Sequence, residues 1–144
     1  MKATGNQIAS EKYKDIIVKE LEFVIKKIDQ APTIEAKLYY FSAVHGILNR
    51  ILNLEYTEEL LLAFYITNET LRMFQQRHAA FKAGDTAIRL TDEQLLGLSR
   101  ITGEFLEAIR NDGSVEEVLK KYVLLLYSTT GNGYYLMEKG VLKI

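Results

Sequence analysis

Apolar side chains recur every three or four residues through most of the chain, and this spacing places them on one face of an α-helix. The first stripe lies within about residues 10–29, and its members are Tyr13, Ile17, Leu21, Val24 and Ile28. The second lies within about residues 34–53 and consists of Ile34, Leu38, Phe41, Val44, Leu48 and Ile51. Because this second segment carries few charges, we expect it to be packed on most sides, at the centre of the fold.

Three further helices are indicated by capping residues as well as by periodicity. We expect Thr57 to cap the third helix, just as Thr33 caps the second. Thr91 with Gln94, and Ser114 with Glu117, have the spacing of capping boxes that begin the fourth and fifth helices. The stripe of the third helix is Leu60, Phe64, Thr67, Leu71, Phe74, His78 and Phe81. The fourth buries Leu95, Leu98, Ile101, Phe105 and Ile109, and the fifth Val118, Leu119, Tyr122 and either Leu125 or Leu126.

Two short segments alternate in a way that is typical of strands. In one arrangement residues 86–90 pair with residues 134–144 as a small β ribbon. In another, residues 123–128 form a strand that Gly131, Asn132 and Gly133 turn back into residues 134–137. The sequence does not decide between these two arrangements. The pattern as a whole predicts a mainly α protein: an antiparallel bundle of about five helices, with or without a small β ribbon near the C-terminus.

The composition fits one helical domain over residues 1–144, and it argues against nucleic-acid and membrane partners. The chain is 48% hydrophobic, and its 18 Lys and Arg against 19 Asp and Glu give a formal net charge of −1. A near-neutral chain offers little attraction to a phosphate backbone, so we expect no nucleic-acid partner. The longest apolar run, residues 60–66, is far shorter than the ~20 residues of a membrane span. The polar N-terminus lacks a secretory signal, so we expect a cytoplasmic protein with no membrane partner.

Candidate metal ligands are few, because the chain has two histidines and no cysteine. If the second and third helices form an antiparallel hairpin, His45 and His78 lie about twelve residues apart along it, or ~18 Å. One metal ion cannot bind both, and no Glu-x-x-His or His-Glu-x-x-His motif occurs, so we predict no metal site and no cofactor. We expect both histidines to pack at the edge of the core, His78 with a partner such as Glu35.

Tyrosine is the residue type in excess, with nine copies. Neighbours on a helix point about 100° apart, so the pairs at 39–40 and 134–135 cannot point entirely into one core. One explanation is that the other helices surround the second helix completely. The other is an interface, where tyrosine is favoured, and it predicts a non-catalytic interaction or regulatory module that forms a homo-oligomer, with a dimer favoured. The expected interface residues are Tyr39, Tyr40, Ile47, Leu54, Tyr134 and Tyr135.

An enzymatic alternative depends on Arg72 and His78. Their Arg-x5-His spacing resembles the Arg-x(4–6)-His motif of the HEPN ribonucleases, which are small helical bundles. The resemblance covers these two residues. It implies a composite cleft at a dimer interface, in which the pair would serve metal-independent RNA cleavage.

A third hypothesis is a binding protein for a small molecule. Ser42, Gly46 and Asn49 form a less apolar and mostly small edge of the second helix. Short side chains there would leave room for a pocket beside the helix. No phosphate loop, nucleophile elbow or dinucleotide fingerprint occurs to name the ligand.

Overall fold

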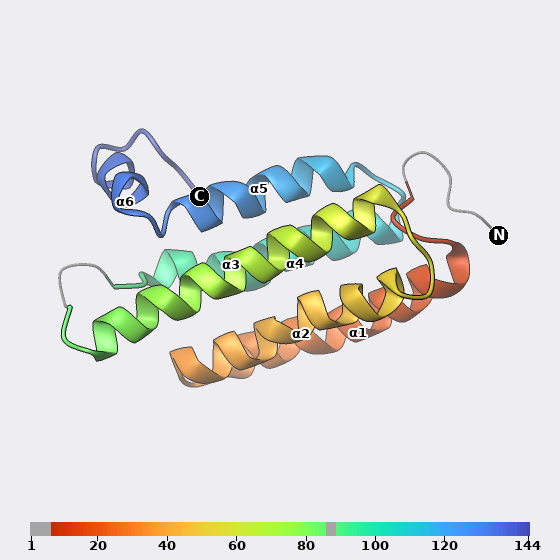
Figure 1. Ribbon diagram of the computed structural model, residues 1–144, viewed down its shortest axis with the longest axis horizontal. Helices are drawn as coiled ribbons and strands as arrows, with labels where there is room; N and C mark the ends of the chain where they lie inside the picture. Colours follow the sequence, from red (N-terminus) through yellow and green to blue (C-terminus); the bar gives the residue numbers. More distant parts are fainter. Residues whose placement is uncertain (1–6, 86–88) are drawn as a thin grey trace.

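The computed structural model describes residues 7–85 and 89–144, and these residues form six α-helices and no strand (Figure 1). The helices are α1 (Glu11–Gln30), α2 (Ile34–Leu52), α3 (Glu58–Lys82), α4 (Asp92–Arg110), α5 (Val115–Tyr127) and α6 (Gly131–Glu138). The prediction of a mainly α bundle is therefore confirmed. The predicted number of about five helices is one too few.

The five long helices lie side by side in an order that differs from their order along the chain. α1 packs against α2 and α4, while α3 packs against α2 and α5, and contact between α4 and α5 completes the bundle. Consecutive long helices run in opposite directions, but the neighbours α3 and α5 run in the same direction (Figure 1). The short α6 lies beyond the end of α5, at the end of the bundle where α3 finishes and α4 begins (Figure 1).

Aromatic rings from three helices meet in the core. Phe41 of α2, Phe105 of α4 and Tyr122 of α5 are fully buried. The Tyr122 ring centroid lies 6.3 Å from that of Phe41 and 6.1 Å from that of Phe105. In the fifth helix it is Leu125, rather than Leu126, that is buried. The second helix is less enclosed than we expected, because Tyr39 on its outer side is 71% exposed.

Local sequence sets most helix starts. The hydroxyls of Thr33 and Thr57 accept hydrogen bonds from backbone N–H groups three residues on, as predicted. Thr91 and Gln94 form the complete predicted capping box. In the predicted box at Ser114 the hydroxyl accepts from the Glu117 N–H, but the Glu117 carboxylate pairs with Lys120 instead of closing the box.

The β ribbon is not present in the described residues. Residues 123–127 belong to α5, and residues 131–138 form α6, while residues 86–88 of the first arrangement lie outside the described residues. The Thr130 hydroxyl accepts from the Gly133 N–H and so caps α6. A Cβ at Gly133 would overlap the Tyr127 carbonyl oxygen, so the glycine permits close contact with the end of α5. The glycines that resembled a turn therefore begin a helix.

Polar contacts fix α6 and the chain leading into it. The Arg77 guanidinium donates to the Thr129 carbonyl oxygen and lies over the Tyr134 ring, 5.7 Å from its centroid. The Gln94 amide nitrogen donates to the Ser128 carbonyl and hydroxyl oxygens at 3.2 and 3.0 Å, and the Tyr134 hydroxyl donates to the Gln94 amide oxygen. α6 is thus tied to both α3 and α4. Among the described residues, no helix combines the length and the apolar character needed to cross a membrane.

Candidate functional site

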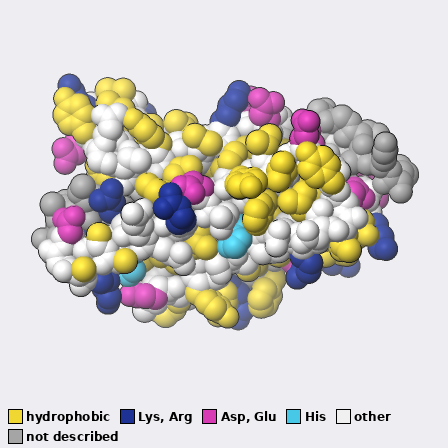
Figure 2. Space-filling view, in the orientation of Figure 1, with side chains coloured by type: hydrophobic (Ala, Val, Ile, Leu, Met, Phe, Trp, Pro, Cys, Tyr) yellow, Lys and Arg dark blue, Asp and Glu magenta, His cyan; other side chains and the backbone are white. Residues whose placement is uncertain are grey.

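A strongly apolar depression lies on the surface between α3 and α5. We call the surface around it the α3–α5 face. A groove of about 490 Å³ is lined by Leu62, Ile66, Glu116, Leu119, Lys120, Val123 and Leu124. Figure 2 shows hydrophobic side chains gathered over the N-terminal half of α3 and the adjoining part of α5.

The side chains around the groove are substantially exposed. Leu62 is 53% exposed, and Val123 and Leu124 are each 44% exposed. Tyr65 and Tyr127 lie one helical turn further along the same helices, and both are also exposed. Contiguous exposed apolar groups of this kind usually mark an interaction site, whereas single ones need no explanation.

Charges at the groove are balanced. Glu116 and Lys120 of α5 both line it, one helical turn apart. Lys120 also pairs with Glu117 of the same helix at 3.3 Å. Since the lining holds one acid and one base, the groove has no net charge that would select a strongly acidic or basic partner.

The predicted interface residues do not form one surface. Tyr39, Tyr40 and Ile47 line a groove of about 660 Å³ between α1 and α2, although Ile47 itself is buried. Leu54 lies in the turn between α2 and α3, at the end of the bundle opposite α6 (Figure 1). The two tyrosines of α6 also differ, because Tyr134 is held by hydrogen bonds and Tyr135 is exposed.

The groove between α1 and α2 also contains part of the predicted ligand pocket. Ser42 and Gly46 line it, and a Cβ at Gly46 would meet nothing within 4 Å. Asn49 is exposed and is not part of the lining. An ion pair between Arg50 of α2 and Glu20 of α1 lies at this groove. The structure therefore brings two of the three predicted pocket residues together.

Arg72 and His78 lie on one uninterrupted helix, and the structure does not bring them together within the chain. His78 follows Arg72 by six positions on the helix, which turns their side chains about 120° apart. Arg72 is exposed and forms an ion pair with Glu69, one turn before it. His78 Nε2 lies 2.9 Å from Glu35 Oε1 on α2. The predicted partner of His78 across the hairpin is therefore confirmed.

The contact with His78 also affects the titration of Glu35. The hydrogen bond from His78, together with one from the backbone N–H of Glu35 and one from Lys82, lowers the pKa of the Glu35 carboxyl from 4.5 to about 2. His45 has a different environment. Its ring lies 6.1 Å from the Phe64 ring, and partial burial lowers its pKa. The described residues contain no group of three or more His, Asp or Glu placed to hold a metal ion.

Sequence reasoning missed the α3–α5 face, although a signal for it was present. Residues 60–66 are seven consecutive apolar residues, and residues 122–127 are six more. A run longer than one helical turn covers every side of a helix. Since neighbouring helices bury only part of that circumference, such runs on two adjacent helices leave apolar side chains facing solvent.

Comparison with protein-family models, with curated proteins and with solved structures finds no match to this chain. A helical-bundle architecture alone does not specify a function.

Proposed function

We propose that the protein is a non-catalytic interaction module that self-associates through the α3–α5 face. The observation that carries the proposal is the exposed apolar groove formed jointly by Leu62, Val123 and Leu124. This face replaces the tyrosine-based interface expected from the sequence, while the expected homo-oligomer is retained.

The size of the face suits a dimer. Five large side chains of the face are on average about half exposed, namely Leu62, Tyr65, Val123, Leu124 and Tyr127. A large side chain presents about 150–250 Å² when it is free, so these five together present roughly 400 Å² of mostly apolar surface. A standard interface buries about 800 Å² per partner, a little over half of it non-polar, or roughly 450 Å². The apolar area of this face therefore matches the apolar share of one standard interface.

The charges on the face favour a second copy as its occupant. In a two-fold dimer the same surface is used by both partners, so it must be complementary to itself. A groove that carries Glu116 and Lys120 can place the acid of one copy near the base of the other. A face with charge of one sign would instead repel its own copy.

The test is sedimentation of the native protein and of matched leucine variants. We expect a dimer at about 100 µM, a concentration that populates complexes with micromolar dissociation constants. Leu62→Glu places a charge in the groove and should give a monomer. Leu96→Glu is the control, because Leu96 is 63% exposed on α4, outside the face, and this variant should remain a dimer. Circular dichroism checks that both variants are folded.

Two results would contradict the proposal in different ways. A native protein that stays monomeric at this concentration excludes self-association itself. A dimer that survives Leu62→Glu but is lost in Tyr39→Glu would retain self-association and place it at the groove between α1 and α2.

A further inference from the structure

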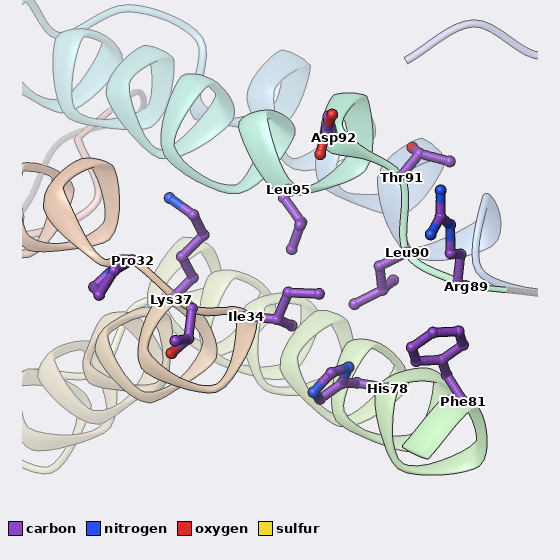
Figure 3. A pocket seen from close by; sticks show the side chains of 11 residues that line it. Pro32, Ile34, Lys37, His78, Phe81, Arg89, Leu90, Thr91, Asp92 and Leu95 are labelled. Carbon is purple, nitrogen blue, oxygen red and sulfur yellow. The ribbon is translucent and has the colours of Figure 1, made fainter. Parts of the chain in front are cut away.

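A second cavity lies at the end of the bundle where three helix ends meet, well away from the α3–α5 face. It has a volume of about 530 Å³. The start of α2, the last turns of α3 and the segment that leads into α4 all contribute to its walls (Figure 3). The cavity is therefore built from parts of the chain far apart in sequence.

The centre of the cavity is apolar. Ile34 of α2, Leu95 of α4 and Leu90, which precedes α4, converge on it from three elements (Figure 3). Leu90 and Leu95 are buried, and Phe81 and Pro32 add further apolar wall. A cavity of ~150 Å³ lined by such side chains accommodates benzene, so this one has room for a considerably larger apolar group.

Cationic side chains stand at two sides of this apolar centre. Lys37 and Arg89 both line the cavity, and Figure 3 shows them on opposite sides of the converging leucines and isoleucine. Within residues 7–85 and 89–144, neither cation has a carboxylate partner within ion-pair distance. Lys37 Nζ donates one hydrogen bond to the Ile28 carbonyl oxygen at 2.9 Å, which leaves two of its N–H groups for other acceptors.

The remaining charges around the cavity leave it cationic. Among the described residues of the lining, Asp92 is the one carboxylate against the two cations Lys37 and Arg89, and the Glu35 carboxylate beside His78 pairs with Lys82 outside the lining. His78 also lines it but makes its hydrogen bond to Glu35. The N-termini of α2 and α4 open at the cavity and add partial positive charge, whereas the C-terminal end of α3 opposes them with partial negative charge.

We propose that this cavity binds an organic anion with an apolar body, such as a carboxylate on a medium-length aliphatic chain or an aromatic ring. The apolar part would occupy the space between Ile34, Leu90 and Leu95. The carboxylate would accept hydrogen bonds from Arg89 or Lys37, whose planar or flexible cationic groups suit it. This site is independent of the proposed self-association, because none of its lining residues belongs to the α3–α5 face.

Octanoate is the probe, and octanol, which has the same chain without the charge, is its matched neutral control. Each is titrated into the full chain labelled with ¹⁵N, and amide shifts in two-dimensional NMR give the site and the affinity. We expect octanoate to shift the amides of Leu90, Thr91 and Leu95, and octanol to bind at least about fivefold more weakly, since a charge-assisted contact contributes that much or more.

Two variants test the role of the cation. The double variant Lys37→Gln/Arg89→Gln should weaken octanoate binding by about five- to tenfold and leave octanol binding unchanged. Lys26→Gln removes an exposed charge of α1 outside the lining, and it should change neither affinity.

Three results would overturn the assignment. Equal affinities for octanoate and octanol would show that the cations do not recognise the anion. Amide shifts confined to the α3–α5 face would show that the chain binds apolar molecules only there. An absence of shifts at millimolar octanoate would show that the cavity does not bind this class of ligand.

Discussion

Replacing Thr102 with valine should destabilise the protein more than replacing Tyr122 with phenylalanine, although both changes break the same hydrogen bond. The two hydroxyl oxygens lie 2.6 Å apart in the core, and both residues are fully buried. Thr102 has a single hydroxyl proton, which it donates to the Leu98 carbonyl oxygen, also at 2.6 Å. Tyr122 must therefore be the donor in the contact with Thr102. Burial raises the pKa of Tyr122, so it keeps that proton at neutral pH.

The magnitudes follow from what each change leaves behind. Tyr122→Phe removes the donor, and Thr102 still donates to Leu98, so we expect a loss of about 1 kcal/mol. Thr102→Val keeps the side-chain shape but leaves the Tyr122 hydroxyl buried without an acceptor, which costs about 1–3 kcal/mol. In the double variant neither side-chain hydroxyl remains, and the Leu98 carbonyl oxygen, which loses the Thr102 hydroxyl, still accepts the backbone N–H of its own helix. Its destabilisation should therefore be close to that of Tyr122→Phe alone.

Urea unfolding followed by circular dichroism measures all four proteins. The comparison is made at one protein concentration, since self-association would otherwise contribute to the apparent stability. Equal slopes of free energy against urea are required before the free energies are compared.

The reasoning would be refuted by the opposite order of the two single variants. It would also be refuted by a double variant whose destabilisation equals the sum of the two, because additivity means that the hydroxyls are not coupled.

Two further predictions concern α6 and the pairing of α2 with α3. Gly133→Ala should cost about 1–3 kcal/mol, because its Cβ would overlap the Tyr127 carbonyl, whereas Gly131→Ala has open space and should change the unfolding free energy by less than about 0.5 kcal/mol. Equal thermal melting of the two variants would contradict this. Since the folded-state pKa of Glu35 is lowered from 4.5 to about 2, its contact with His78 stabilises the fold above pH 4.5, and that contribution is lost as pH falls towards 2. The melting temperatures of the native protein and Glu35→Gln should therefore converge over this range, and a difference that stays constant with pH would disprove it.

The features that could be predicted are those that depend on neighbours in sequence. Thr33, Thr57 and Thr91 cap helices by accepting hydrogen bonds from backbone N–H groups three residues further on. The local sequence was therefore enough to predict where these helices begin. The contact between His78 and Glu35 could also be predicted from the sequence. A short turn makes α2 and α3 an antiparallel hairpin, and counting residues outward from the turn shows which residues face each other.

The features that were missed depend on contacts distant in sequence. Ser10 has the residue type of an N-cap, but its hydroxyl donates to the Glu55 carboxylate and caps nothing. Gly133 suggested a turn, because the reason for a glycine there is the nearby Tyr127 carbonyl rather than its own conformation. The α3–α5 face arises from a parallel pair of helices that are not consecutive, and no periodicity within either helix specifies that pairing.

The packing of α1 against α4 has a consequence for folding during synthesis. Lys14 on α1 pairs with Asp112, just after α4, across 98 residues of chain. Ribosomes add roughly 5–20 residues per second, so synthesis of these 98 residues takes about 5–20 s. The side of α1 that packs on α4 has no partner helix during that time. During that interval α1 can pair with α2 alone, and part of its apolar stripe remains available to chaperones or to other nascent chains. A slower rate of translation would therefore lengthen the period in which this apolar stripe lacks its partner helix.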